Sequence, residues 1–288
     1  MPLTNNNLKE TLDYYRAEIR RLRQVIKDLS PSLEALLRNR GLKLFKKETG
    51  DDLLLPDKSY LNSYYRMLHK YSFRLFLRDV IKFQKGFTLM DVARYATPEV
   101  TSDYITYLKK IGLIKASKGY FQLIKPVKSF GETLEWFLAE ILKREFLMEA
   151  FWGVRFKKGS VPPSPEGDYD VIAKFNCSIL YVEVKSSPPK QIYQKEIKAF
   201  IKRLKSLVPE LSIFFMDTEL RMKDKIVPMF EEETGTPFQR IKKEIFYGVS
   251  NSCENLKKPI FIMNSSDSII NNLETVFSWY HRKLVVTK

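Results

Sequence analysis

The centre of an expected β-sheet lies in two short apolar runs joined by a polar turn, Asp170-Val171-Ile172-Ala173-Lys174-Phe175, Asn176-Cys177-Ser178 and Ile179-Leu180-Tyr181-Val182-Glu183-Val184-Lys185. Short runs of this kind are typical of β-strands, and so tight a turn makes the two strands antiparallel neighbours. In the second strand Tyr181, Glu183 and Lys185 share one face, because successive side chains point to opposite sides. The hairpin can also bring Asp170 close to Glu183. We therefore expect two carboxylates and a lysine to converge at one end of it.

Helices and strands alternate on both sides of this hairpin, over residues 129–288. A helix is expected from Gly131 to Phe146. Further strands are expected at 154–156, 211–216 and 260–263, and further helices at 189–207, 220–232 and 266–282. Alternation of this kind predicts an α/β fold with a mixed central sheet flanked by helices.

Residues 59–128 have a different pattern, in which helical stretches at 64–84, 88–95 and 101–111 precede a hairpin at 113–124. Three helices followed by a β-hairpin resemble a winged helix-turn-helix. The resemblance implies DNA binding, with one group of side chains facing a groove and two lysines near backbone phosphates. These are, respectively, Thr101, Ser102, Thr106 and Lys109, and Lys115 and Lys118. The alternative is a winged helix used for protein contacts.

Residues 1–58 are expected to form a helical segment and a linker. Apolar residues recur there at alternating gaps of four and three: Leu8, Leu12, Tyr15, Ile19, Leu22, Ile26 and Leu29. This heptad pattern favours a parallel two-stranded coiled coil, in which Glu18 can meet Arg23 of a second chain. We therefore expect a homodimer; the alternative is an amphipathic helix packed on its own chain. Residues 42–58 are expected to be a connecting loop.

The composition limits which partners and which cellular compartment are compatible with this chain. The 288 residues carry a net charge of +15, of which +12 falls on residues 1–128 and +3 on residues 129–288. Such an excess favours a phosphate backbone as partner, although a solvated lysine-rich surface would have the same composition. No apolar run approaches membrane-spanning length, and no signal peptide is evident, so we expect no membrane partner. Two cysteines indicate a reducing cytoplasm.

The sequence lacks the residues that several classes of enzyme require. Only two histidines are present, which excludes a histidine-rich metal site, and no glycine-rich phosphate loop indicates a nucleotide cofactor. Carboxylate chemistry remains. Asp170 and Glu183 would offer the hard oxygen ligands that Mg²⁺ and Mn²⁺ prefer. Such a cation activates water and stabilises charge on a phosphodiester, and Lys185 can neutralise further charge. The alternative is an ion pair on a solvated face of the sheet.

The hairpin resembles the core of the PD-(D/E)XK nucleases, a superfamily that includes archaeal Holliday-junction resolvases and many restriction endonucleases. The resemblance covers about residues 131–218 and rests on Gly167-Asp168-Tyr169-Asp170-Val171-Ile172-Ala173 and Tyr181-Val182-Glu183-Val184-Lys185-Ser186-Ser187. It implies a restriction-endonuclease-like sheet, with Asp170 and Glu183 as metal ligands and Lys185 as the catalytic lysine. Asp168 is the alternative aspartate, because Pro165-Glu166-Gly167 replaces the family's plain Pro-Asp.

The same resemblance implies a supporting glutamate from the preceding helix. Glu135 has the better spacing from Gly131, and Glu132 lies one turn earlier. After the hairpin, Lys195 and Lys198 have helical spacing and can follow a nucleic-acid backbone, or simply form a solvated helix face.

Taken together, these features predict a Mg²⁺- or Mn²⁺-dependent endonuclease that hydrolyses phosphodiester bonds in DNA, structured or branched DNA included. The alternative is a non-catalytic nucleic-acid-binding or regulatory protein that uses the same fold as a scaffold. A third possibility is a protein-interaction module built on the coiled coil and the winged helix.

Overall fold

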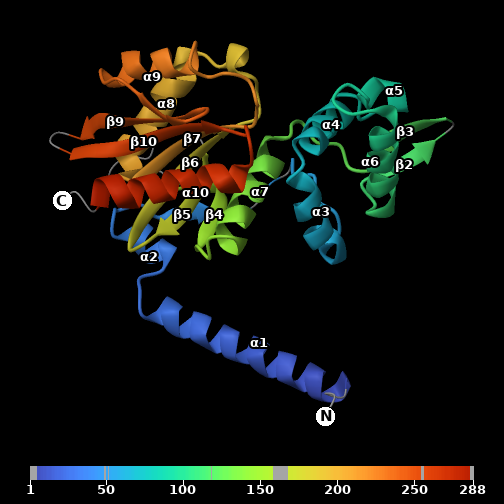
Figure 1. Cartoon of the computed structure of the whole chain (residues 1–288), viewed down its shortest axis with the longest axis horizontal. Coiled ribbons are helices and arrows are strands. Elements are labelled where there is room, and N and C mark those ends of the chain that lie inside the picture. The colour runs from blue at the N-terminus through green and yellow to red at the C-terminus, as the bar shows by residue number, and fades with distance from the viewer. Residues whose placement is uncertain are drawn as a thin grey trace.

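The computed structural model describes residues 5–48, 50, 52–117, 119–157, 168–253 and 256–285. Within these residues the chain forms an α/β fold around an eight-stranded mixed sheet (Figure 1). The strands follow in the order β1 (Leu44–Lys46), β4 (Ala150–Phe156), β5 (Tyr169–Phe175), β6 (Ser178–Lys185), β7 (Leu211–Met216), β10 (Leu256–Asn264), β9 (Ile245–Cys253) and β8 (Gln239–Lys242). β6, β7 and β10 run parallel to one another, and the other neighbours are antiparallel. The α/β class and the mixed sheet are confirmed.

The β5–β6 hairpin is confirmed as an antiparallel pair, in which Val171 pairs with Val182 and Phe175 with Ser178. Its two-residue turn needs a positive φ, and Asn176 adopts a φ of 53° there. Almost all of β6 is buried, which is typical of a central strand covered on both faces.

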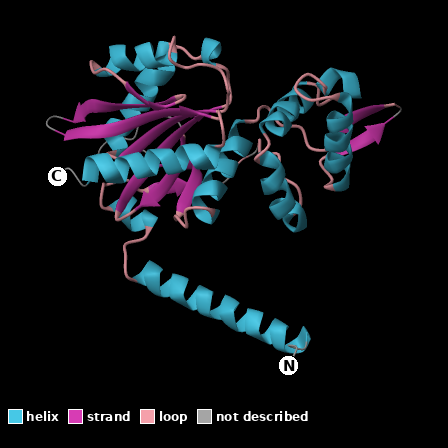
Figure 2. Cartoon of the chain, viewed as in Figure 1, coloured by secondary structure: helices cyan, strands magenta, loops and turns pink. Residues whose placement is uncertain are grey.

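Helices cover both faces of the sheet (Figure 2). α7 (Gly131–Arg144) and α10 (Ile269–Trp279) contribute to one apolar cluster. α2 (Leu33–Arg38), α8 (Gln194–Leu207) and α9 (Ile226–Thr234) contribute to the other. Short helical turns complete this part: η2 (Pro189–Gln191), which precedes α8, and η3 (Tyr280–Val285), which follows α10. Together with β1 and the other seven strands, these elements are called the sheet unit below.

A second group of elements, called the helical unit, follows the turn η1 (Lys58–Tyr60). It comprises α3 (Leu61–Leu68), α4 (Tyr71–Lys82), α5 (Leu89–Val92), α6 (Pro98–Lys110) and the hairpin of β2 (Ile114–Ser117) and β3 (Tyr120–Leu123). The single helix predicted over 64–84 is wrong, because the chain breaks at Lys70, whose backbone is extended. The break leaves the carbonyl oxygens of Leu68 and His69 free to accept bonds from Arg74.

Two further expectations need correction. Residues 42–58 are not simply a loop, because Leu44–Lys46 forms β1 and pairs with β4 at the edge of the sheet. The chain thus enters the sheet unit, leaves it for the helical unit and returns through α7. Thr101 is fully buried in α6, with an exposed fraction of 0%, so it cannot face a nucleic-acid groove.

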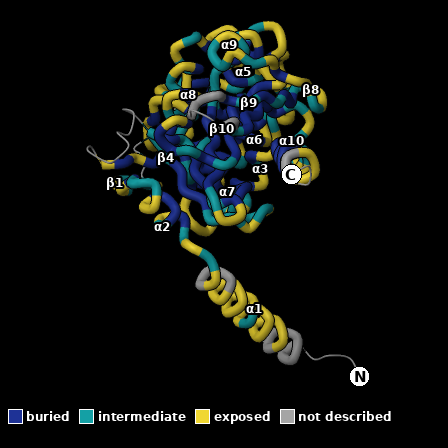
Figure 3. The backbone as a smooth tube through the Cα atoms, turned by 90° about the vertical axis from the view of Figure 1, so that its left-hand side faces the viewer, coloured by how far each residue is buried: buried dark blue, intermediate teal, exposed yellow. Residues whose placement is uncertain are grey.

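The N-terminal helix α1 (Asn5–Asp28) extends away from the rest of the chain (Figures 1 and 3). Its heptad positions are exposed where side chains are described: Leu12, Tyr15, Ile19 and Leu22 are 47–58% accessible. Leu8 and Ile26 lie outside the residues whose side chains the structure describes. Across the described residues, no helix combines the length and apolar character that membrane crossing requires.

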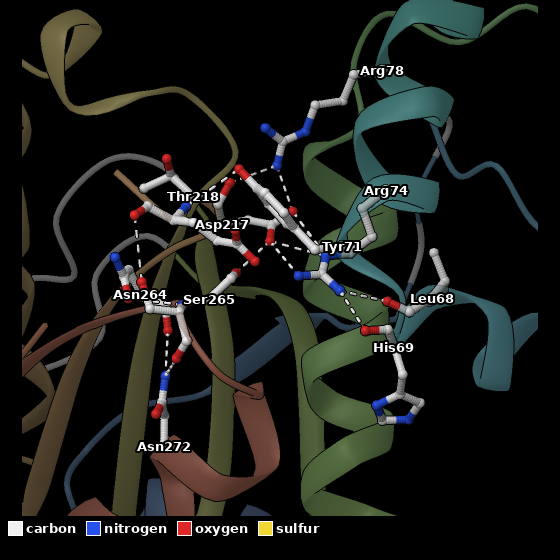
Figure 4. Close-up of polar contacts among 12 residues, drawn as sticks. Leu68, His69, Tyr71, Arg74, Arg78, Asp217, Thr218, Asn264, Ser265 and Asn272 are labelled. Carbon is white, nitrogen blue, oxygen red and sulfur yellow. Dashed lines mark hydrogen bonds and ion pairs between the residues drawn. The ribbon is translucent and has the colours of Figure 1, made fainter. Parts of the chain in front are cut away.

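A buried ion pair joins the helical unit to the sheet unit (Figure 4). Arg74 of α4 is 2% exposed, and its guanidinium lies 2.8 Å from the carboxylate of Asp217, which is 0% exposed and directly follows β7. Arg78 and Ser265 also donate to this carboxylate. Burial opposes ionisation of Asp217, but the two guanidiniums and the hydroxyl outweigh it and lower its pKa. The Asp217 N–H bonds to the carbonyl oxygen of Lys185 at 2.8 Å, so this contact borders the end of β6.

Replacing Asp217 by asparagine should lower the free energy of unfolding by about 3–5 kcal/mol, because Arg74 would keep a buried charge without its counter-ion. Urea denaturation followed by circular dichroism measures the change. The control is Asp224→Asn, which removes an ion pair with Arg221 whose two side chains are each 68% exposed. The control should leave the midpoint unchanged. Equal effects of both substitutions would contradict the assigned importance of the buried pair.

Candidate active site

Asp170 opens β5 beside the end of β6. Its Oδ2 accepts a hydrogen bond from the backbone N–H of Val184 at 2.7 Å, which places the carboxylate next to Glu183 in the neighbouring strand. Asp168, two residues earlier, turns instead toward β4, where the Arg155 guanidinium donates to both its oxygens. Of the two aspartates, Asp170 is therefore the one that borders Glu183 and Lys185.

Glu183 lies at the centre of a closed polar cluster and is 1% exposed. Lys185 donates to its Oε1 at 2.7 Å, and Arg203 of α8 donates to both oxygens at 3.0 and 3.1 Å. The Tyr181 hydroxyl is a further donor to Oε2. Burial of Glu183 excludes the alternative of an ion pair on a solvated sheet face.

A third carboxylate comes from α7. A Cβ on Gly153 of β4 would lie 4.0 Å from Oε2 of Glu135, so this side chain rests beside the strand that neighbours Asp170. Gly153 also adopts a φ of 56°, a conformation that favours glycine. Glu132, one turn earlier, accepts a hydrogen bond from the backbone N–H of Asp52 at 3.1 Å. Glu132 thus holds the chain at residue 52, and Glu135 is the glutamate placed toward Asp170.

The electrostatics divide this cluster into two parts. Burial, and then the charge of Glu183, raise the pKa of Asp170 to about 7, although Lys185 and Arg203 act in the opposite direction. Burial, and then the charge of Asp170, raise the pKa of Glu135 to about 9. Burial lowers the pKa of Lys185, but Glu183 and Asp170 outweigh it, so its pKa is raised and the ammonium keeps its charge. Lys185 and Arg203 contact the carboxylate of Glu183, whereas the charge of Glu183 repels Asp170 and the charge of Asp170 repels Glu135.

This repulsion bears on whether the residues fit a divalent cation. Carboxylate oxygens are the ligands that Mg²⁺ and Mn²⁺ prefer. No hydrogen bond or ion pair of Glu135 is found with any other described residue, and a cation would relieve its repulsion with Asp170. As the side chains stand, no set of three acidic, histidine or cysteine side chains in the described ranges forms a complete cage. Asp170 would therefore hold the cation together with Glu183, once Glu183 exchanges its contact with Lys185, and Glu135 lies beside them.

The predicted nucleic-acid-binding residues lie on two separate surfaces. Ser102, Thr106 and Lys109 are exposed along α6, and Lys115 is exposed on β2 of the same helical unit. Lys118 lies outside the described residues. Lys195 and Lys198 are exposed on α8 of the sheet unit, the helix that also supplies Arg203. The structure thus groups the four predicted catalytic residues and leaves the α6 set apart from them.

Arg203 is a residue of the cluster that the sequence did not predict. It flanks the apolar stripe of α8, which contains Phe200 and Leu204, and this position gives a weak signal that its stem is partly buried. Nothing in the sequence indicates that its charge reaches Glu183, twenty residues earlier. The signal for Tyr181 was stronger, because strand alternation already places it on the face of Glu183.

No family model matches this chain, and no curated protein matches it. A crystal structure of protein VC1899 from Vibrio cholerae is similar to 87% of this chain, with a TM-score of 0.47 and 11% sequence identity. The chain spans 62% of the length of that protein. A similarity of this strength establishes neither a family nor a function.

Replacing Glu135 by glutamine should flatten the pH dependence of stability. Because the folded pKa of Glu135 is raised to about 9, the folded chain binds this proton more tightly than the unfolded chain does. Protonation of Glu135 therefore stabilises the folded chain below its pKa in the unfolded chain, which is about 4.3. This contribution to the free energy of unfolding falls as the pH rises, and it is lost completely above the folded pKa.

The measurement is urea denaturation at pH 5 and pH 9. The difference in free energy of unfolding between these two conditions should be smaller in Glu135→Gln than in the unaltered chain. Glu274→Gln, at an exposed position of α10, is the control and should keep the original difference. An unchanged difference in Glu135→Gln would refute the raised pKa assigned to Glu135.

Proposed function

We propose that this chain is a metal-dependent endonuclease of the PD-(D/E)XK type, which hydrolyses phosphodiester bonds in DNA, including structured or branched DNA. The observation that carries the proposal is the meeting of three carboxylates and a charged lysine, Glu135, Asp170, Glu183 and Lys185, from α7, β5 and β6. Such a group suits the binding of a divalent cation beside an anionic substrate. We also propose that the chain acts in the cytoplasm.

In this proposal Asp170 and Glu183 are metal ligands, and Glu135 holds a water molecule beside them. When bound, Mg²⁺ or Mn²⁺ supplies an activated water and neutralises charge on the phosphodiester. Lys185 keeps its proton because of the neighbouring carboxylates, so it acts as a cation toward a phosphate oxygen and not as a base. Arg203 of α8 also holds Glu183 in place, through hydrogen bonds to both of its oxygens.

Capture of DNA is assigned to the helical unit, acting as a winged helix. The exposed side chains of Ser102, Thr106 and Lys109 recur on one side of α6, and Lys115 follows on β2. Exposed hydroxyls and ammonium groups along one helix are suited to contacts with phosphates and base edges. The charge excess of +12 over residues 1–128 supports the same assignment.

The exposed heptad seam of α1 supports a homodimer. Leu12, Ile19 and Leu22 are each about half exposed, and a second copy of the helix would bury them in a parallel coiled coil. Glu18 and Arg23 would face one another across such a pair.

One observation favours a second candidate, a nucleic-acid-binding or regulatory protein without catalysis. Glu183 is 1% exposed, and both its oxygens already accept bonds from cations. A cluster closed in this way is also what a structural scaffold would contain.

Cleavage assays separate the two candidates. The purified chain is incubated with supercoiled, linear, branched and single-stranded DNA, and with RNA, in Mg²⁺ or Mn²⁺ and in EDTA. We expect DNA cleavage that requires Mg²⁺ or Mn²⁺. Its rate should fall by at least about 100-fold in Lys185→Ala, because the ammonium group beside the reacting phosphate is lost. Lys205→Ala, at an exposed position of α8, is the control and should cut normally.

Three results would count against the nuclease: no cleavage of any substrate, cleavage that survives Lys185→Ala, or equal cleavage in EDTA. Binding of DNA without cleavage would favour the second candidate.

The dimer is tested by light scattering coupled to gel filtration. The unaltered chain should have twice the mass of one chain, and Ile19→Asp should dissociate it, because a charge would enter the apolar seam. Ala17→Asp changes the opposite side of α1 and should remain dimeric. A monomer at every concentration of the unaltered chain would remove the coiled coil from the proposal.

A further inference from the structure

Two loops leave the carboxyl ends of the neighbouring parallel strands β6 and β7, directly after Lys185 and Asp217. In open α/β sheets, ligands bind in the crevice outside the carboxyl ends of the strands. Both loops have the same unusual combination of an exposed apolar side chain and exposed cations. Tyr193 is 59% exposed after the first strand, and Leu220 is 57% exposed after the second.

Two lysines lie over the ring of Tyr193. The Nζ atoms of Lys195 and Lys225 lie 5.8 and 5.5 Å from its centroid. Lys225 is held in turn by a hydrogen bond of 2.9 Å to the carbonyl oxygen of Lys190. The backbone of Tyr193 is fixed as well, because its N–H donates to Glu196 at 2.8 Å at the start of α8. The ring is therefore held in a defined position and still presents more than half its surface to solvent.

Four lysines of these loops, Lys190, Lys195, Lys223 and Lys225, form no ion pair with any described residue. Their charge is available to an anionic partner. An exposed aromatic ring among cations is the combination that single-stranded nucleic acids need, since bases stack on the ring and phosphates contact the lysines. A base in the interior of a duplex has both faces covered by its neighbours, so the ring favours an unpaired base.

Tyr193 lies close in sequence to Lys185 of the candidate active site. It follows Lys185 by eight residues, which limits their separation to about 29 Å for a fully extended chain. The turn η2 lies between them and shortens the path further.

We propose that Tyr193, with Lys195 and Lys225, is a stacking site for an unpaired nucleotide in the segment that follows the carboxyl end of β6, the strand that carries Lys185. This proposal rests on the proposed function and narrows it. The substrate would be a nucleic acid with an unpaired base close to the bond that is cut, as at a single strand, a flap or a branch point.

The test measures binding without cleavage. The unaltered full-length chain in EDTA is titrated into a fluorescent single-stranded oligonucleotide, into its blunt duplex, and into a single strand that contains 2-aminopurine. Fluorescence anisotropy gives the dissociation constants, and quenching of 2-aminopurine reports stacking on the ring. A nuclease assay plays no part in this measurement, so failure of the catalytic proposal and failure of the stacking proposal are distinguishable.

Tyr193→Ala should weaken binding of the single strand by about 5- to 150-fold, which corresponds to the loss of one stacked base, and should abolish the quenching. Binding of the duplex should change less than about twofold, and Tyr193→Phe should behave as the unaltered chain does, because the ring is retained. Phe45→Ala is the matched control: Phe45 is 67% exposed on β1, at the far edge of the sheet, and its loss should have no effect.

Three outcomes would overturn the stacking site. The unaltered chain could fail to bind the single strand, Tyr193→Ala could leave its dissociation constant within about twofold, or the loss could be equal for single strand and duplex. Thermal unfolding of each variant is measured in parallel. Should the alanine variant fold poorly, the absence of 2-aminopurine quenching by the unaltered chain would still overturn the stacking site.

Discussion

The arrangement of this molecule depends on the buried ion pair of Arg74 and Asp217. Both side chains are almost completely withdrawn from water, so each charge needs the other, and Arg78 and Ser265 complete the bonding of the carboxylate. The helical unit and the sheet unit meet at this point, and the apolar cluster around Tyr65, His69 and Phe137 continues from one unit into the other. Because Asp217 also bonds to the backbone of Lys185, the end of the strand that carries the candidate catalytic lysine is held by the same contact.

The local parts of the fold could be predicted from the sequence, and the contacts between distant residues could not. The β5–β6 hairpin and β7 follow from apolar runs and a short polar turn, and the shared face of Tyr181, Glu183 and Lys185 follows from alternation. β1 escaped prediction because it has three residues, and these lie among lysines that resemble a loop. Arg74 and Asp217 are separated by 143 positions, and each would pass for a surface charge. Thr101 has the composition of a groove-facing residue, and only packing shows that it points inward.

The candidate site combines two electrostatic conditions within a few residues. Around Glu183 the negative charge is balanced by Lys185 and Arg203, and Tyr181 donates a further hydrogen bond. Around Glu135 and Asp170 negative charge accumulates, and burial makes it costly. In the proposed nuclease, a cation would be bound where the negative charge is in excess, beside Asp170. Sequence comparison of motifs names these residues but does not reveal this imbalance, which depends on the approach of α7 to Gly153.

The path of the chain has a consequence of its own. Since β1 precedes the helical unit and α7 follows it, the helical unit is an insertion that is tethered to the sheet unit at both ends. Two tethers keep its effective concentration at the sheet high even if the contact between Arg74 and Asp217 opens, and they allow a hinge movement but no departure. The entropy lost on closing the contact again is correspondingly small. In the proposed nuclease, a unit held in this way would be able to open and close repeatedly around DNA and still remain attached.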